Sequence, residues 1–179
     1  MLVKMKNVRL AFPQIWEATT VNGEGKPAFS ATFIFDKKNS AYKDIDAAIN
    51  AVAEEKWKTK ASAVLKELRM KDRVALHDGD LKADYDGFPG NFFVSSRNEK
   101  RPLILDADKT PLTVAAGRPY GGCYVNANVD IWAMDNQYGK RVCATLVGIQ
   151  FKADGEAFSG AAPGTADDFD SEEDMADIA

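Results

Sequence analysis

Histidine and cysteine are scarce in this chain. Its 179 residues include one histidine, His77, and two cysteines, Cys123 and Cys143. Two cysteines without a second pair of metal ligands argue against a zinc site and against a disulfide framework. A β-hairpin is predicted near the C-terminal end of residues 1–152. In this hairpin Cys143 would lie opposite Ile131 and not opposite Cys123, which also argues against a disulfide between the two cysteines. A single histidine restricts the common acid–base and metal-assisted mechanisms, so the composition favours a binding protein over an enzyme.

Long apolar runs and the familiar phosphate-binding and nucleophile motifs are also absent from the sequence. Lys4, Lys6 and Arg9 interrupt the N-terminal stretch, so it lacks the apolar centre of a signal peptide, and no run is long enough to span a membrane. The sequence has no glycine-rich loop ending in Lys-Ser or Lys-Thr and no Gly-x-Ser-x-Gly elbow. We therefore expect a soluble cytoplasmic protein that is not an enzyme and that needs no cofactor or metal.

Charge is divided unevenly along the chain. Nine of the 27 acidic residues and none of the 23 basic residues lie in Ala153–Ala179, which leaves 18 acids against 23 bases in residues 1–152. The basic body attracts polyanions, and the acidic tail can compete for the same surface. Glycines and mutually repelling acids predict that residues 153–179 are disordered. The simplest alternative to competition with a polyanion is that this tail only keeps the protein in solution. The apolar residues among these acids are candidates for docking a partner protein: Phe169, Met175 and Ile178.

Alternating apolar and polar residues predict β-strands along most of the body. Val3–Phe12 alternates with a slip at Asn7 that a β-bulge can absorb, and Pro13 is expected to end regular pairing. The second strand, Ala28–Phe35, places its phenylalanines on one face, where we expect them in the core. Further strands are predicted at Asn91–Arg97, Leu103–Leu105, Cys123–Ala133 and Val142–Phe151, with a turn at Asp135–Gly139 between the last two.

One helical block interrupts these strands. Ser40 can cap a helix that begins near Ala41, and a second helix is predicted over about Thr59–Lys71. A single helical block does not fit repeated βαβ units, which need a helix between every pair of strands. We therefore predict a mainly β (α+β) fold: an OB-fold-like β-barrel over residues 1–152 with a helical insertion at about residues 40–71.

Basic residues and aromatic rings occur together beside the predicted turns of the body. Single-stranded DNA presents closely spaced phosphates and unstacked bases, so a sequence-tolerant binder needs both kinds of side chain along one groove. The candidate phosphate ligands are Lys4, Lys6, Arg9, Arg97, Lys100, Arg101, Arg118, Lys140 and Arg141. The candidate base-stacking rings are Phe12, Trp16, Tyr85, Phe88, Phe93, Tyr120 and Tyr138. Any one ring could instead belong to the core, so the prediction of DNA binding rests on the combination.

Two alternative functions are also compatible with the sequence. The acid-rich loop after the short apolar run Val74–His77 contains Asp78, Asp80, Asp84 and Asp86, which together with His77 could hold the metal of a nuclease. The same residue types beside glycines are typical of turns. The other alternative is an interaction protein whose acidic tail mimics DNA and occupies the DNA site of another protein.

Five stretches resemble the phage single-stranded-DNA-binding proteins that join an OB-fold core to an acidic C-terminal tail: Val8–Pro13, Lys26–Lys37, Asp78–Lys82, Gly87–Arg97 and Tyr120–Phe151. The resemblance implies an OB-fold barrel, sequence-tolerant binding of single strands, and roles in phage DNA replication, recombination and repair in the cytoplasm of the infected bacterial host. It also implies a tail that contacts replication or recombination proteins and restrains DNA binding, and we add weak self-association as an expectation. One departure is the end of the chain, Asp174–Ala179, which lacks the aromatic residue that often finishes such tails.

Overall fold

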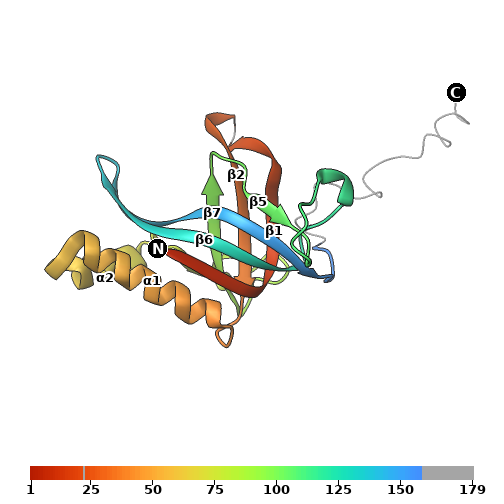
Figure 1. Cartoon of the computed structure of the whole chain (residues 1–179). Helices are drawn as coiled ribbons and strands as arrows, with labels where there is room; N and C mark the ends of the chain where they lie inside the picture. Colours follow the sequence, from red (N-terminus) through yellow and green to blue (C-terminus); the bar gives the residue numbers. More distant parts are fainter. Residues whose placement is uncertain (22, 159–179) are drawn as a thin grey trace, which may run out of the picture.

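The computed structural model describes residues 1–21 and 23–158, which form seven β-strands and two α-helices. The strands are β1 (Leu2–Val21), β2 (Glu24–Phe35), β3 (Leu76–Asp78), β4 (Phe92–Asn98), β5 (Leu103–Leu105), β6 (Tyr124–Asn136) and β7 (Gly139–Ala153). The helices are α1 (Ser40–Trp57) and α2 (Ala61–Met70), and short 3₁₀ turns lie at Lys58–Lys60, Gly79–Lys82 and Val114–Ala116. Both helices fall between β2 and β3, so the described chain is mainly β with one helical insertion, as predicted (Figure 1).

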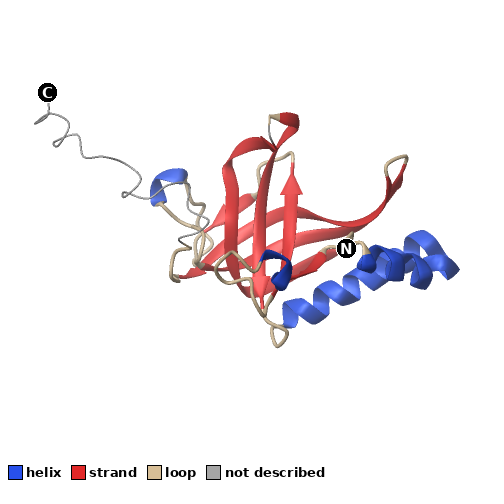
Figure 2. Cartoon of the chain, turned by 180° about the vertical axis from the view of Figure 1, so that it is seen from behind, coloured by secondary structure: helices blue, strands red, loops and turns tan. Residues whose placement is uncertain are grey.

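Five of the strands close into a barrel. In the sheet, β4, β2, β1, β6 and β7 are hydrogen-bonded neighbours in that order, and β4 also pairs in parallel with β7 through Arg97 and Thr145. The first barrel strand therefore lies between the second and the fourth, and the fifth closes the ring against the third, which is the arrangement of an OB-fold. Figure 2 shows the barrel from behind, with the helices beside one end of it. The prediction of an OB-fold-like barrel is confirmed.

The first strand keeps its apolar side chains inside the barrel by bulging. Asn7 has a positive φ of 55°, and the pairing of β1 with β6 shifts register between Met5 and Val8. Because the extra residue restores the alternation, side chains on both sides of the bulge are buried in the barrel core, as the slip at Asn7 predicted. Regular pairing ends at Pro13 as expected: the register with β2 shifts between Ala11 and Gln14 and again on both sides of Thr19, although β1 itself continues to Val21.

The helical insertion packs its apolar side against the barrel. The predicted spacing is confirmed, since Ile45, Ile49 and Val52 of α1 are all buried in the main core cluster with residues of β1 and β6. The N-cap is Asn39 and not Ser40, because the Asn39 side chain accepts a hydrogen bond from the Ala41 N–H at 2.9 Å. Neither described helix contains a stretch that is long and apolar enough to cross a membrane.

A second apolar cluster covers the outer surface of the barrel and contains a residue that we assigned to the tail. Phe158 is buried there against Ile34, Phe88 and Phe93. Strand β7 runs to Ala153, and the segment that follows it lies against the barrel. The start of the acidic tail at residue 153 is therefore corrected for residues 153–158, which belong to the folded body. The remaining residues 159–179, with Phe169, Met175 and Ile178, lie outside the described residues.

One arginine fastens this C-terminal segment. Arg9 donates from Nε to the Gly122 carbonyl oxygen at 3.0 Å and from Nη2 to the Glu156 carbonyl oxygen at 2.7 Å. Its guanidinium also lies 4.2 Å from the centre of the Phe158 ring, a cation–π contact. The Phe158 N–H donates to the Gly121 carbonyl oxygen at 3.2 Å. Residues 154–158 therefore form a strap over β1, held by backbone, charge and aromatic contacts.

The two cysteines lie apart and are both free. Cys143 pairs with Trp132 across the β6–β7 hairpin, one position from the predicted partner Ile131. Cys123 is buried, and burial raises the pKa of its thiol to about 11. A buried thiol in this state packs as a small apolar side chain.

Candidate nucleic-acid interface

A groove of about 580 Å³ lies over the seam where β4 and β7 close the barrel. One wall comes from β4 and the residues around β3, and the other comes from the β6–β7 hairpin. OB-folds bind oligonucleotides on the face of their second and third strands and with the loops that join strands one to two and four to five. In this barrel the third strand is β4 and the last of these loops is the β6–β7 turn, so the groove lies where an OB-fold takes its ligand.

Three predicted phosphate ligands line this groove: Arg97, Lys100 and Arg141. Arg97 donates from Nη2 to the Lys26 carbonyl oxygen at 2.8 Å, which fixes its guanidinium beside the start of β2. Lys100 and Arg141 are exposed and form no ion pair with any residue in the described ranges, so their charges are available to a ligand. Glu99 is the one carboxylate among the described residues that line the groove, which leaves the lining net positive.

Trp132 provides an aromatic surface on the hairpin wall. Its neighbours Ile131 and Val129 point into the barrel, whereas the indole lies on the outer face of β6 and is 40% exposed. The indole N–H donates to Thr145 Oγ1 at 2.9 Å, which holds the ring along the surface of the hairpin. Trp132 was not among the residues predicted from the sequence to contact DNA. The sequence does contain a sign of this role, because Trp132 occupies a position of the strand where the alternation otherwise places polar, outward-facing residues.

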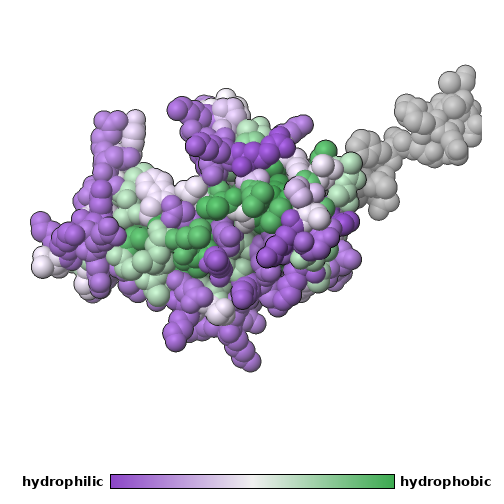
Figure 3. Space-filling model, viewed as in Figure 1, coloured by the Kyte–Doolittle hydropathy of each residue, from purple (hydrophilic) through white to green (hydrophobic). Residues whose placement is uncertain are grey.

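The hairpin continues beyond the barrel and carries two more predicted residues at its tip. Tyr138 is 77% exposed in the turn, and Lys140 lies on the returning strand with its Nζ 3.9 Å from Asp135 Oδ1. The tip projects from the body in Figure 1 and is hydrophilic in Figure 3. The structure thus gathers Tyr138, Lys140 and Arg141 on the same hairpin that forms one wall of the groove.

Two rings that we predicted to stack on bases are core residues. Phe88 is 1% exposed and Phe93 is 3% exposed, and both belong to the second apolar cluster. The imidazole of His77 stacks over Phe93 with their centres 4.9 Å apart and so covers the ring on the groove side of β3. Because neither phenylalanine presents a face to solvent, the base-stacking assignment of Phe88 and Phe93 is corrected.

Phe12 and Tyr85 form an exposed edge of the same cluster. Their ring centres are 5.2 Å apart with the planes at 88°, and the ammonium of Lys82 lies 5.8 Å from each ring centre. Tyr85 is exposed and Phe12 is half-buried, with a positive φ of 48° that turns it out of the strand. These two predicted rings therefore remain accessible, next to a lysine that we did not select.

The basic residues at the start of β1 do not join the groove. Lys4 and Lys6 are exposed on β1, and Lys4 lies in a separate hollow between the N-terminus and α1. Arg9 is half-buried and its guanidinium is used by the C-terminal strap. Because the bulge restores the alternation, Lys4, Lys6 and Arg9 share the outer face of β1, but phosphate binding by Arg9 would compete with its structural contacts.

Arg101 and Trp16 lie together on another side of the barrel. Arg101 donates from Nη2 to the Trp16 carbonyl oxygen at 3.1 Å, and its guanidinium lies 5.7 Å from the Phe29 ring centre. Both residues line a hollow of about 280 Å³ with Val114. Trp16 is half-buried and packs partly against the main core. This pair is separate from the groove lining.

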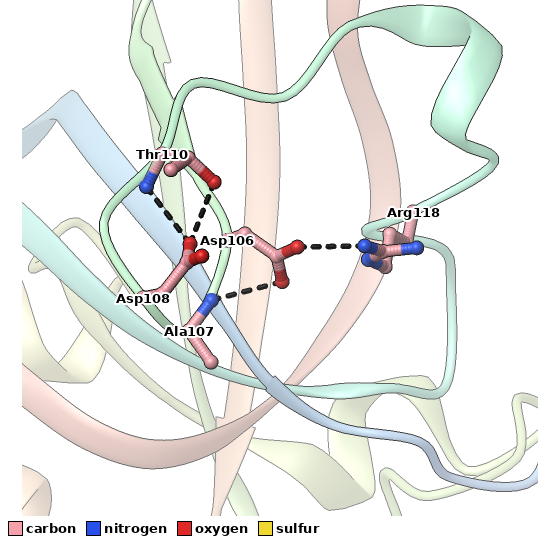
Figure 4. A network of polar contacts seen from close by, with 5 residues as sticks. All are labelled: Asp106, Ala107, Asp108, Thr110 and Arg118. Atoms are coloured by element: carbon pink, nitrogen blue, oxygen red, sulfur yellow. Dashed lines mark hydrogen bonds and ion pairs between the residues drawn. The ribbon is translucent and has the colours of Figure 1, made fainter.

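Arg118 is part of a polar network in the loop that follows β5 (Figure 4). Its Nη2 donates to Asp106 Oδ2 at 2.6 Å, and the hydrogen bond from Arg118 is the main reason why the pKa of the Asp106 carboxyl is lowered. Asp108 accepts hydrogen bonds from the hydroxyl and the N–H of Thr110, which lower its pKa in the same way. The predicted phosphate ligand Arg118 is therefore paired with a carboxylate that stays ionised.

Tyr120, a predicted stacking ring, packs against the main core and supports the C-terminal strap. Its hydroxyl donates to Asp154 Oδ1 at 2.8 Å and accepts from the Gly155 N–H at 3.2 Å. Burial of the ring is the largest cause of the raised pKa of the Tyr120 hydroxyl. Tyr120 therefore has a structural role at the strap, and its stacking on a base stays a prediction.

The acid-rich loop uses its carboxylates to hold its own backbone. Asp78 accepts from the Asp80 N–H and Asp80 accepts from the Gly90 N–H, both at 2.9 Å. His77 is 2.7 Å from Asp72 Oδ1 through Nδ1 and does not join these carboxylates. Within residues 1–21 and 23–158, no three His, Cys, Asp or Glu side chains are grouped to hold a metal ion. The contacts of His77, Asp78 and Asp80 therefore do not favour the nuclease alternative.

Comparison with known proteins shows to which family this chain belongs. The model of the Enterobacter phage Enc34 ssDNA-binding protein family matches residues 1–179. The chain belongs to this family. The chain is also similar in sequence to the putative protein p50 of Acyrthosiphon pisum secondary endosymbiont phage 1. The two are 42% identical over 173 residues, which cover 95% of this chain and 93% of that protein.

Solved structures agree with this membership of the Enc34 ssDNA-binding family. The single-stranded DNA-binding protein from bacteriophage Enc34 in complex with ssDNA matches with a TM-score of 0.74 at 27% identity, over 88% of this chain and 89% of that chain. Its C-terminal truncation matches with a TM-score of 0.73 at 26% identity, over 88% of both chains. The gp2.5 protein of bacteriophage T7 shares the fold, with a TM-score of 0.59 at 12% identity over 96% of this chain and 98% of that chain. The resemblance to phage single-stranded-DNA-binding proteins is confirmed.

Proposed function

We propose that this protein binds single-stranded DNA in the groove over the β4–β7 seam and has no catalytic role. The observation that carries the proposal is the lining of the groove, where Arg97, Lys100 and Arg141 lie beside the exposed indole of Trp132. Cations along a groove neutralise successive phosphates, and exposed rings stack on bases of any kind. The Enc34 relative in complex with ssDNA supports this assignment.

Sequence tolerance follows from the kinds of contact that the groove offers. Stacking on Trp132 or Tyr138 would use the π-face that every base has, and contacts to phosphate carry no base information. Such a protein would cover and protect single strands during phage DNA replication, recombination and repair in the cytoplasm of the infected host. Phe12 and Tyr85, with Lys82, extend the candidate surface beyond the groove.

We also propose that residues 159–179 modulate this binding. Seven acids and no basic residue lie in this segment, so it can compete electrostatically with DNA for the positive groove. Phe169, Met175 and Ile178 are the apolar residues through which the segment would dock replication or recombination proteins. Weak self-association through such contacts is part of the same proposal.

Titration of a fluorescent oligo-dT and a matched duplex with the full-length protein tests the proposed function. We expect tighter binding to the single strand, with log affinity falling against log salt at a slope of about −2 to −3.5 if three to five phosphates are neutralised. Incubation of the same complex with magnesium or manganese is expected to leave the DNA intact. Failure of both the full-length protein and a tailless variant to bind oligo-dT would contradict the proposal and favour the DNA-mimic alternative.

Removal of residues 159–179 is expected to strengthen oligo-dT binding about tenfold at about 50 mM salt and much less at about 300 mM, because salt screens the competition between tail and DNA. The truncation ends after Phe158 because residues 153–158 pack on the barrel. A variant with the same length and neutral Asn or Gln in place of the tail acids is the matched control, and it should match the truncation. Equal affinity of full-length and truncated protein at low salt would contradict the competition.

A further inference from the structure

The part of the β6–β7 hairpin that forms the groove wall extends past its neighbours in the barrel. Pairing of β1 with β6 ends at Leu2 and Asp130, and β4 meets β7 at Thr145. From there to the turn at Asn136 and Gly139, the described strand pairings of β6 and β7 are to each other. A two-stranded hairpin alone is marginally stable in water, yet this one carries Trp132, Tyr138 and Arg141. Contacts from outside the sheet must therefore set its position.

The helical insertion and the loop between α2 and β3 each supply such a contact. Trp57, at the end of α1, is buried and donates from its indole Nε1 to Asp135 Oδ2 on the hairpin at 2.9 Å. Behind the returning strand, the Arg73 carbonyl oxygen accepts a hydrogen bond from the Val142 N–H at 3.0 Å. The hairpin is thus fastened by α1 through β6 and by the loop after α2 through β7.

The Arg73 side chain adds a third contact near the tip. A Cβ placed on Gly139 would lie 3.6 Å from Arg73 Nη2, so the guanidinium packs directly behind the turn. Lys140 of the hairpin is close enough to Glu67 of α2 to contribute to the lowered pKa of that carboxyl, after the larger effect of Lys71. The face of the hairpin that is turned away from the groove therefore rests on the helical insertion and on the loop that follows it.

We propose that the helical insertion is a strut that sets the position of the hairpin wall of the DNA groove, with Trp57 as its main positioning residue. This proposal rests on the proposed function and assigns a task to residues that do not line the groove. A wall held in its bound position costs less conformational entropy when DNA binds, so loss of the strut should appear as faster dissociation.

Trp57→Phe removes the indole N–H but keeps an aromatic ring in the buried site. We expect it to weaken oligo-dT binding about five- to tenfold, mainly through a faster dissociation rate, and to speed amide hydrogen exchange in residues 133–142 about tenfold relative to the barrel strands. Asp46→Asn is the matched control, because it breaks an exposed ion pair with Arg69 elsewhere on the insertion. The control should leave both measurements unchanged.

Substitution of Asp135 separates positioning from charge. Asp135→Ala removes a carboxylate from the positive wall, so electrostatics alone predicts tighter DNA binding, whereas loss of the strut predicts weaker binding. Asp135→Asn keeps an oxygen that can accept the Trp57 N–H and should retain at least wild-type affinity. The double variant Trp57→Phe/Asp135→Ala should bind oligo-dT no more weakly than the single variant with the lower affinity, because both substitutions remove the same Trp57–Asp135 hydrogen bond. Asp135 lies on the surface, so this series remains decisive if Trp57→Phe fails to fold.

The outcomes distinguish this proposal from the proposed function. If wild-type protein binds oligo-dT but Trp57→Phe and Asp135→Ala bind equally well or better, the strut is overturned and the groove assignment stands. If hydrogen exchange of the hairpin rises without a loss of affinity, the hairpin is fastened by Trp57 but its position does not matter for DNA, which also overturns the proposal. If the wild-type protein does not bind oligo-dT, the proposed function fails, and the role of the strut in DNA binding fails with it.

Discussion

Replacing Arg97, Lys100 and Arg141 together by alanine is expected to weaken oligo-dT binding on the order of 100-fold at low salt. The three cations line one groove, and loss of each phosphate contact costs about 1 kcal/mol or more. The slope of log affinity against log salt should also become less steep by about 2, since each phosphate contact with a single strand contributes about 0.7. Fluorescence anisotropy over a range of salt concentrations measures both quantities.

Two further variants show whether position or total charge causes this loss. Lys38→Ala/Lys43→Ala/Lys152→Ala removes three exposed cations away from the groove lining and should change affinity much less. Trp132→Ala should weaken binding about fivefold or more through lost stacking while leaving the salt slope unchanged. Equal losses in the groove variant and in the control variant would show that binding depends on overall charge and would contradict the groove.

Replacing Phe158 by alanine is expected to lower the free energy of unfolding by about 3 kcal/mol, because the ring is buried. This value is the lower end of the range for a buried phenylalanine, since the segment around Phe158 can relax into part of the cavity. The lost contacts are those with Ile34, Phe88 and the Arg9 guanidinium. For a body of this size the melting temperature should fall by about 6–12 °C, measured by thermal or urea unfolding.

Truncations and a surface variant control this stability prediction. Ending the chain after residue 152 should cost at least as much as Phe158→Ala, whereas ending it after Phe158 should leave the melting temperature close to that of the full chain. Tyr138→Ala removes a ring of similar size that is 77% exposed and should change the stability little. A melting temperature of Phe158→Ala within about 2 °C of the wild type would show that the strap contributes nothing to the fold.

The strap explains why the boundary of the acidic tail was not predictable from charge. Asp154 and Glu156 share the composition of the tail, yet the Glu156 backbone carbonyl is held by Arg9 and the Asp154 carboxylate by Tyr120. Both partners are far away in the sequence, so neither appears in a local window of charge and glycine content. Composition separates acidic from basic segments, but it does not show where the last tertiary contact lies.

Elements with a clear local pattern were predictable from the sequence. Strands alternate with a period of two and helices recur at about 3.6 residues, so the C-terminal hairpin, the strand at Ala28–Phe35 and the helical insertion were placed closely. The slip at Asn7 was predictable as a bulge because a single extra residue restores the alternation. The basic body was visible once the charges were counted along the sequence.

The sequence by itself determined the barrel strands, the helical insertion and the separation of charge, because these depend on residue order and composition. Tertiary structure decided which of the outward-facing rings are open to solvent. Phe93 and Trp132 both lie on outer faces of their strands, but Phe93 is covered by His77 and Phe88, while Trp132 stays exposed on a hairpin wall. The period of a strand says which side a residue faces, and only the packing of distant segments determines whether that side is covered or open to solvent.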